Sequence, residues 1–228
     1  MQKFTFNRQM TGLFTEQQNI IAYQQDHLLQ FIEQPFSKIN FKKQIEKKSS
    51  NYSTDLRLNL VDYFEKVYAF EQSVKINANI ELLKSQKTFT ITTGHQLSIL
   101  TGPIYFIYKI IHIIRLCEEL TAEYPECNFV PVFWLASEDH DLDEIRSVNV
   151  FGKELSWQTQ QEGPVGRMDC SGLAALKVEL NSFFSNQSQS EVKDLLEKYS
   201  GKNLTEATFN LVNELFSSYG LLIMDGDN

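Results

Sequence analysis

Apolar residues in the first part of the chain recur every three or four positions, which is the spacing of an amphipathic helix. The helices expected from this spacing span about 15–32, 36–48, 55–72 and 77–84. Residues 49–53 are polar and predict a break, with Ser53 or Thr54 as the N-cap of the next helix. We therefore expect residues 1–85 to form a helical N-terminal segment.

A different pattern begins after residue 87. Threonine alternates with larger apolar residues over 88–93, which predicts a strand. A long apolar helix is expected over 103–123, and the continuous apolar run 129–136 predicts a strand covered on both faces. Because Pro131 lacks an N–H group, we expect the ladder of this second strand to begin near Val132. Strand, helix and strand in succession predict a parallel βαβ unit.

The rest of the chain predicts a hairpin, three helices and a last strand. The hairpin is expected over 147–157 with its turn at 151–152, and the helices at 173–184, 190–199 and 205–218. Gly220 is expected to end the last helix before a buried strand at 221–224. Residues 86–228 thus predict an α/β sheet domain with a hairpin and helical insertion at about 145–218. Because a polar loop follows the last strand at once, we expect the chain to be the N-terminal part of a longer protein.

Composition and charge narrow the classes of function. The 228 residues carry a net charge of −8, which argues against nucleic-acid binding. The lysines of the one basic cluster are interpreted as a solvated helix face; they are Lys42, Lys43, Lys47 and Lys48. The N-terminus lacks the apolar core of a signal peptide, and no apolar run reaches about 18 residues. We expect no membrane partner and a cytoplasmic location.

The three cysteines predict neither a disulfide framework nor a zinc site, because they are odd in number and lack C-x-x-C spacing. Cys117 falls within the expected long helix and is interpreted as a small buried side chain. No metal site is predicted.

Polar residues gather just after two of the predicted strands. The first cluster contains Thr93, Gly94, His95 and Gln96, and the second contains Ser137, Glu138, Asp139, His140 and Asp141. In an open α/β sheet, ligands bind outside the carboxyl ends of the strands. We therefore expect the two clusters to belong to one site, with His95, Glu138, Asp139 and His140 as its catalytic candidates.

Each cluster also has a purely structural interpretation. Backbone N–H groups at Gly94 and Gly102 could hold an anion, or could simply form a strand-to-helix turn in which Thr101 or Gly102 caps the helix. His95 could bind phosphate or donate a proton, or could be a hydrogen-bonded structural residue. The acidic cluster could hold an amine, orient a base or bind Mg²⁺. Alternatively, one of its aspartates, Asp139 or Asp141, caps the following turn.

Three residues outside the clusters are further binding candidates. Tyr105 and Lys109 are four residues apart and share one face of the expected helix, where Lys109 could reach a substrate carboxylate. Arg167 lies in a glycine-containing loop and could clamp a carboxylate, although a surface arginine is the alternative.

These stretches resemble one known family. Residues 92–96, 100–105, 108–109 and 131–141 are similar to motifs of the bacillithiol biosynthesis cysteine-adding enzymes, also described as cysteine ligases. The ending Tyr219–Asp225 is similar as well, so the resemblance covers nearly the whole chain. Many members carry Gln where this chain has His95, which we interpret as a lineage variant.

The resemblance implies a Rossmann-like parallel sheet core and an amide-forming reaction. Family members are more than twice as long and carry a C-terminal coiled coil that forms a homodimer; that part is absent from this sequence. Their proposed reaction adds cysteine to the amine of glucosaminyl-malate, so the implied partners are small molecules. The cofactor is unknown, with ATP or ADP as candidates.

Two alternatives stay open beside the ligase. The order strand, turn, histidine and helix is also similar to class I nucleotidylyltransferases and aminoacyl-tRNA synthetases, which favours a nucleotidylyltransferase-like enzyme acting on another small substrate. A non-catalytic nucleotide- or metabolite-binding protein is the other alternative.

Overall fold

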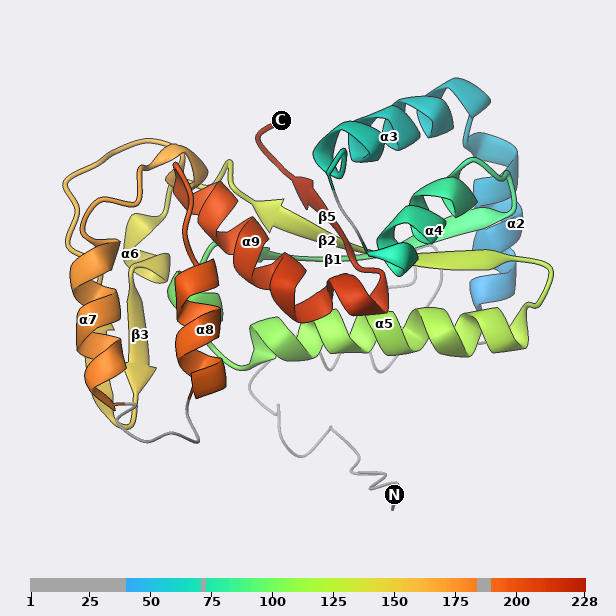
Figure 1. The fold of residues 1–228 in the computed structure, drawn as a ribbon. Coiled ribbons are helices and arrows are strands. Elements are labelled where there is room, and N and C mark those ends of the chain that lie inside the picture. Colours follow the sequence, from blue (N-terminus) through green and yellow to red (C-terminus); the bar gives the residue numbers. More distant parts are fainter. Residues whose placement is uncertain (1–39, 71–72, 184–189) are drawn as a thin grey trace, which may run out of the picture. The chain divides into compact units, whose positions relative to one another are not determined.

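The computed structural model describes residues 40–70, 73–183 and 190–228 of the chain, which forms two compact units, Met1–Tyr52 and Ser53–Asn228 (Figure 1). The helix predicted over 15–32 lies outside the described residues.

In the first unit, helix α2 spans Phe41–Asn51 and exposes all four clustered lysines, as predicted. The helix continues through Ser49 and Ser50, where a break was expected. Their hydroxyls donate to the carbonyls of Ile45 and Lys47 at 2.8 Å each, so both polar side chains are satisfied within the helix.

A parallel sheet with the strand order β1-β2-β5 forms the centre of the second unit. Strand β1 (Thr88–Gln96) pairs along its whole length with β2 (Asn128–Ala136). Strand β5 (Leu222–Asp225) pairs with the second half of β2, again in parallel. The predicted α/β class with a parallel sheet is confirmed.

Proline is accommodated inside β2, and the prediction that the ladder begins near Val132 is wrong. The pairing with β1 already includes Pro131, opposite Ile91. Strand β5 begins only opposite Val132, so among the described strands Pro131 has a neighbour on one side. Proline is tolerated at a position with an unpaired side, as in an edge strand, because a missing N–H group directed to that side removes no ladder hydrogen bond.

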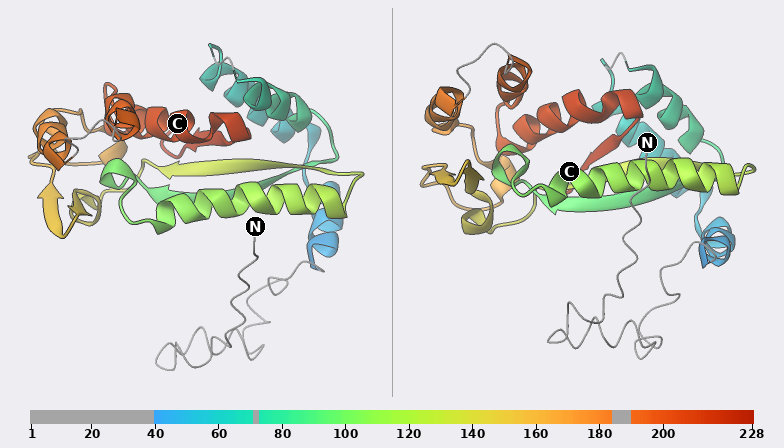
Figure 2. Two further views of the ribbon diagram at one scale, coloured as in Figure 1. Left: turned by 60° about the horizontal axis from the view of Figure 1, so that its bottom comes forward. Right: turned by 90° about the horizontal axis from the view of Figure 1, so that it is seen from below.

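Helices cover the two faces of the sheet. The helices of one face are α5 (Tyr105–Glu123) and α9 (Leu204–Phe216), and those of the other are α3 (Thr54–Val67) and α4 (Val74–Leu83). Successive residues of β2 divide between two hydrophobic cores: Phe133 packs with α5 and α9, and Val132 packs with α3 and α4. The helices that flank the strands are drawn in two further views in Figure 2. Cys117 on α5 is buried, and burial raises its thiol pKa to about 12.

Helix α3 is fixed to the sheet by hydrogen bonds at two places. Ser53 caps its first turn, as predicted, by accepting the N–H of Leu56. The buried Arg57 donates from Nη1 to the carbonyls of Leu83 and Thr88, at 2.9 and 3.1 Å. These bonds join α3 to the end of α4 and the start of β1. The division into an N-terminal helical segment over residues 1–85 and a sheet domain after it stays a prediction. Helices α3 and α4 pack on the sheet, within the unit Ser53–Asn228.

Two tyrosine hydroxyls close the outer edge of β5. The hydroxyl of Tyr68 accepts the N–H of Ile223 at 2.8 Å, and that of Tyr63 accepts the N–H of Asp225 at 2.9 Å. Unpaired N–H groups on an edge strand otherwise invite pairing with another chain. Side chains from α3 therefore take the place that a further strand would occupy.

The predicted insertion packs beyond the carboxyl ends of the strands. Its elements are α6 (Leu142–Ile145), β3 (Ser147–Val150), β4 (Lys153–Ser156), the 3₁₀ turn Val165–Arg167, α7 (Leu173–Phe183) and α8 (Ser190–Lys198). The hairpin turns at Phe151 and Gly152, both with positive φ, as expected for a tight turn. In Figure 1 these elements lie past the arrowhead of β2. Among the described helices, none combines the length and the apolar content needed to cross a membrane.

Removing the Tyr68 hydroxyl tests the closed edge. We expect Tyr68→Phe to lower the free energy of unfolding by about 1–3 kcal/mol, because the buried N–H of Ile223 then lacks its acceptor. Urea unfolding of the chain measures this change. Tyr108→Phe, at a side chain 64% exposed on α5, is the matched control and should be neutral. A loss no greater than that of the control would contradict the role of the hydroxyl.

Candidate functional site

The register of the sheet brings the predicted polar clusters to one edge. His95 lies beside Leu135, and Leu135 lies beside Asp225, so the loops after all three strands begin side by side. From the end of β1, Gln96 donates through Nε2 to Asp139 at 2.8 Å and to Glu144 at 2.7 Å. The two clusters therefore meet, as expected, and Glu144 joins them although the sequence did not single it out.

The hydrogen bonds of the Gln96 side chain influence the ionisation of the neighbouring carboxyl groups. Both hydrogens of its amide group are donated to carboxylates, which leaves Oε1 as the atom able to accept a hydrogen bond. Donation from Gln96, followed by the N–H of Asp141, holds the pKa of Asp139 below its usual value. This carboxylate is consequently ionised and suited to holding a cation.

Asp141 has a structural role at the start of α6. Its Oδ1 accepts the N–H of Glu144 at 3.1 Å, so it is the N-cap of that short helix. The capping interpretation of the acidic cluster therefore holds for Asp141. The cap also positions Glu144 next to Gln96.

His95 is buried between aromatic rings, with 8% of its surface exposed. Its ring centroid lies 5.0 Å from that of Tyr105 and 5.1 Å from that of Phe106. Nδ1 lies 2.9 Å from the carbonyl oxygen of Gln96. A carbonyl can only accept, so Nδ1 carries the hydrogen and Nε2 has the free lone pair. Burial lowers the pKa of His95, and the positive charge of Lys109 lowers it further. The hydrogen bond to the backbone carbonyl of Gln96 acts in the opposite direction and raises it.

Lys109 and Gly94 meet at the end of β1. Lys109 donates from Nζ to the carbonyl of Gly94 at 3.0 Å and lies 5.7 Å from the ring centroid of Tyr105. Tyr105 and Lys109 thus share one helix face, as predicted. A Cβ atom on Gly94 would lie 3.1 Å from Cβ of Trp134, so the tight packing of β1 on β2 already accounts for a glycine. Thr93 lies half-buried in the same strand, opposite Phe133.

The turn between β1 and α5 differs from the predicted helix cap. Three successive residues, Leu100, Thr101 and Gly102, have φ of 54°, 75° and 53°. Helix α5 begins only at Tyr105, without a side-chain cap. The N–H groups of Thr101 and Gly102 donate to the carbonyls of Ser98 and Ile99, so both are used inside the turn. A branched residue with positive φ is strained, at a cost of about 1–3 kcal/mol.

Ser137 connects the loops that follow β2 and β5. It is fully buried; its hydroxyl donates to Asp225 and accepts the N–H of Asp227 at 3.0 Å. Arg167 binds Asp227 through Nε and Nη2, at 2.5 and 2.7 Å. Sequence reasoning missed both aspartates, although they directly follow the third strand. The strand-end rule that selected the acidic cluster would also have selected them.

The loop carrying Arg167 approaches β2 closely enough to require glycine. The N–H of Gly166 donates to the carbonyl of Ser137 at 3.0 Å, and the hydroxyl of Thr205 donates to the carbonyl of Gly166 at 3.0 Å. A Cβ atom at position 166 would lie 2.4 Å from Oγ1 of Thr205 and 2.5 Å from Cβ of Ser137. The loop is thus held rigidly against the strand end.

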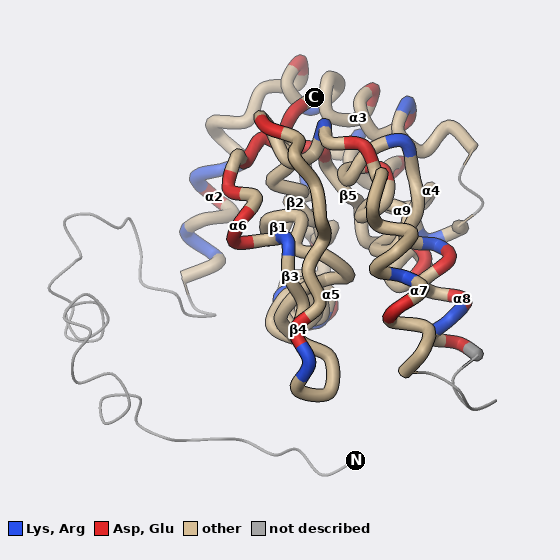
Figure 3. Tube along the Cα trace, turned by 90° about the vertical axis from the view of Figure 1, so that its left-hand side faces the viewer, with Lys and Arg blue, Asp and Glu red and all other residues tan. Residues whose placement is uncertain are grey.

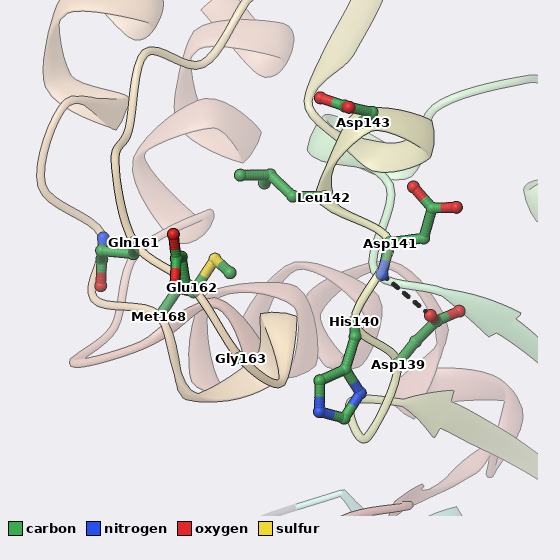
Figure 4. Close-up of a pocket in the computed structure, with 9 residues that line it drawn as sticks. All are labelled: Asp139, His140, Asp141, Leu142, Asp143, Gln161, Glu162, Gly163 and Met168. Carbon is green, nitrogen blue, oxygen red and sulfur yellow. Dashed lines mark hydrogen bonds between the residues drawn. The ribbon is translucent and has the colours of Figure 1, made fainter.

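An open depression of about 560 Å³ lies on the other side of the acidic loop (Figure 4). It is lined by Asp139, His140, Asp141, Leu142, Asp143, Gln161, Glu162, Gly163 and Met168. In Figure 4 the carboxylates of Asp139 and Asp141 point away from the wall formed by Gln161 and Glu162. The depression therefore contains exposed His140 but none of the β1 residues, and the Gln96 cluster is the better candidate for chemistry.

Glu138 lies outside both the Gln96 cluster and the depression. It is exposed, and Oε1 accepts from Nε1 of Trp134 at 3.4 Å. Seen end-on in Figure 3, acidic residues follow the chain around α6 and towards the C-terminus. In the described part of the chain, no three His, Cys, Asp or Glu side chains are grouped so that they could hold a metal ion.

Comparison with known proteins assigns a family. Residues 6–228 match the family model described as "Bacillithiol biosynthesis BshC, N-terminal Rossmann-like domain". A protein of Flavobacterium psychrophilum named "Putative cysteine ligase BshC" is 49% identical over 82% of this chain, and one of Flavobacterium johnsoniae with the same name is 46% identical over 83%. A third with that name, from Natranaerobius thermophilus, is 32% identical over 89%.

The chain therefore belongs to the BshC family, and its sheet belongs to a Rossmann-like domain. The matched region makes up 36% of each Flavobacterium relative and 40% of the Natranaerobius relative. The chain thus spans little more than a third of the length of these proteins. This agrees with the resemblance found in the sequence.

The bond from Gln96 can be tested through the titration of Asp139. We expect Gln96→Leu to raise the pKa of Asp139 towards its ordinary value of 3.8, because the largest cause of its lowering is removed. Carbon-13 NMR of the carboxyl groups measures this pKa. Gln160→Leu, at an exposed glutamine on the neighbouring loop, is the control. An unchanged Asp139 titration in Gln96→Leu would show that the bond does not control it.

His95 should make stability depend on pH. Its folded-state pKa lies below the ordinary value of 6.5, so the unfolded chain binds the proton more readily. The resulting stability is fully present above pH 6.5 and is lost as the pH falls through the folded-state pKa. Unfolding free energies measured from about pH 8 to about pH 5 should fall more steeply for the wild type than for His95→Gln. Parallel curves would contradict the neutral, buried state of His95.

Proposed function

We propose that the chain forms the catalytic core of a cysteine ligase that joins cysteine to the amine of glucosaminyl-malate. Membership of a family whose relatives are named cysteine ligases supports the ligase class. The observation that carries the proposal for this chain is the meeting of Gln96, Asp139 and Glu144 at the strand ends. The substrate pair follows from the resemblance and is tested below.

The Gln96 cluster has the chemistry of a site for an amine. Two carboxylates and the free Oε1 of Gln96 are all acceptors, which an ammonium group with three hydrogens can satisfy. The lowered pKa of Asp139 keeps that carboxylate charged. We assign this cluster to binding and orienting the acceptor amine. A carboxylate of low pKa is a weak base, so the proton must go elsewhere.

His95 is the group suited to take that proton. An amine attacks an activated carboxyl carbon only after losing a proton; the C–N bond then forms as the C–O bond to the activating group, a phosphate or adenylate derived from ATP, breaks. A base works best when its pKa lies near the working pH. His95 is neutral at pH 7 because its pKa is lowered, and its hydrogen on Nδ1 leaves Nε2 able to accept. Gln96 links the base to the amine site. Its backbone carbonyl orients the His95 ring, and its side-chain amide holds the carboxylate of Asp139.

The described strand-end residues do not form a phosphate cradle. The N–H groups of Thr101 and Gly102 are used within their turn, and Arg167 is paired with Asp227. Lys109 is directed to the carbonyl of Gly94. We therefore route no step through a nucleotide held by these residues. The substrate carboxylate binders predicted from the sequence, Lys109 and Arg167, serve in this proposal as structural contacts of the edge.

Activity assays with matched variants test the proposal. A full-length family member and the 228-residue chain are incubated with cysteine, glucosaminyl-malate and ATP, and the thiol product is followed by mass spectrometry. In a full-length member that carries histidine at the position of His95, we expect replacement of that histidine by Ala, or of the residue aligned with Asp139 by Asn, to lower the ligation rate by about 100-fold or more. Asp143→Asn is the control, because that side chain is 89% exposed and its ion pair is with the nearby Arg146.

The outcomes separate the readings of the site. No thiol product from the full-length protein would eliminate the specific reaction. Pyrophosphate release that does not require cysteine would favour a nucleotidylyltransferase-like enzyme. Equal activity of the Asp139 and Asp143 variants would remove the Gln96 cluster from the mechanism while leaving the ligase assignment intact.

A further inference from the structure

Tyr105 presents an exposed aromatic ring directly beside the candidate base. It is the first residue of α5, and 51% of its surface is exposed. The next residue, Phe106, is fully buried in the hydrophobic core. Of two successive aromatic residues, one therefore lies in the core and the other at the surface, near the end of β1 where His95 and Gln96 lie.

Contacts with the end of β1 hold the Tyr105 ring in place. Its centroid lies 5.0 Å from that of His95, with an angle of 43° between the ring planes. Nζ of Lys109 lies 5.7 Å from the Tyr105 centroid and donates to the carbonyl of Gly94 at 3.0 Å. A cation and an imidazole thus contact the ring, while half of its surface stays exposed. A ring that is already ordered loses little conformational entropy when a ligand covers it.

The position of Tyr105 distinguishes it from other exposed tyrosines, because single aromatic residues are common at protein surfaces. Tyr219 has a similar environment: it is 55% exposed, and Nζ of Lys75 lies 6.0 Å from its ring centroid. Tyr219 precedes β5, however, and so lies at the amino end of the parallel strands. Tyr105 follows β1 and lies at the carboxyl end, where ligands bind in an open α/β sheet.

The chemistry of the acceptor decides what can cover the Tyr105 ring. In the proposed reaction, the Gln96 cluster holds the acceptor amine and His95 takes its proton. The amine of a glucosaminyl group is bonded directly to a carbon of the pyranose ring, so the sugar lies next to His95 and within reach of Tyr105. The C–H hydrogens on a pyranose face carry partial positive charge, and the face of a tyrosine ring is negative. The two faces are therefore complementary in shape and in charge.

We propose that Tyr105 is a specificity-determining residue whose exposed ring stacks against the pyranose of an amino-sugar acceptor. This inference rests on the proposed function for the position of the amine, and it adds the residue that selects the sugar. An acyclic amine satisfies the acceptors of the Gln96 cluster equally well but leaves the Tyr105 ring uncovered. The ring thus favours a cyclic acceptor over an acyclic one.

Binding of methyl glucosaminide to the 228-residue chain tests the stacking without any ligation. This probe keeps the pyranose and the amine and lacks the malate. Saturation-transfer NMR should show transfer to the C–H hydrogens of its ring, and a titration gives the Kd. We expect Tyr105→Leu to weaken binding by about tenfold and Tyr105→Phe by less than about twofold, because phenylalanine keeps the aromatic face. Tyr219→Leu is the matched control and should bind as the wild type does.

Three results of this titration would overturn the stacking. Equal losses in Tyr105→Phe and Tyr105→Leu would show that the hydroxyl makes the contact and the ring face does not. Equal binding by Tyr105→Leu and Tyr219→Leu would show that the ring makes no contact with the sugar, as would a wild type that does not bind the probe. Because Tyr105 is half exposed, its variants should keep the unfolding temperature of the wild type, which thermal denaturation checks.

Kinetics of a full-length relative that carries tyrosine at this position separate the stacking from the proposed reaction. Replacement of that tyrosine by Leu should raise the KM for glucosaminyl-malate about tenfold and leave kcat and the KM for cysteine unchanged, because stacking acts equally in the ground state and the transition state. An unchanged KM for the acceptor would overturn the stacking and leave the ligase function intact. So would a lower kcat alone, which would show that Tyr105 acts through His95. A wild type that forms no thiol product would eliminate the ligase function, and binding of methyl glucosaminide would then decide the stacking by itself.

Discussion

The parallel register of β1, β2 and β5 is the constraint on which the site depends. It places Gln96, Ser137 and Asp225 at the ends of adjacent strands, so that side chains far apart in the sequence can share hydrogen bonds. A slip of one residue would exchange the faces of a strand and turn Phe133 away from the core formed with α5. The burial that fixes the core therefore also fixes the geometry of the strand ends.

Hydrogen bonds hold the loops that follow the strands in fixed conformations at this edge. Ser137 bonds to the loop after β5 with its hydroxyl and to Gly166 with its carbonyl. Arg167 adds a two-point contact to Asp227, and Asp141 caps the helix that presents Glu144. Buried polar groups are costly when unpaired, so this arrangement is favoured only when all three loops are in place. Rigid strand ends can hold reacting groups without first having to order them.

Much of this architecture could be predicted from the sequence, because the signals are local. Threonine alternation marked β1, the long apolar run marked β2, and Gly152 marked the hairpin turn. The strand-end rule brought Gln96 and Asp139 into one site. Periodicity could not reveal the left-handed turn at Leu100, which depends on tertiary packing. Nor could it reveal the partners of Tyr63 and Tyr68, whose contacts lie 162 and 155 residues away along the chain.

The charge at the strand-end edge also has a consequence for how a substrate would arrive. Acidic side chains gather there, while His95 is neutral at pH 7 and Arg167 is already paired with Asp227. The resulting negative potential acts over a Debye length of about 10 Å at 0.1 M salt. A molecule with an amine at one end and carboxylates at the other would be turned amine-first before contact. Its carboxylates would then point outward, towards the part of the surface beyond Gln96.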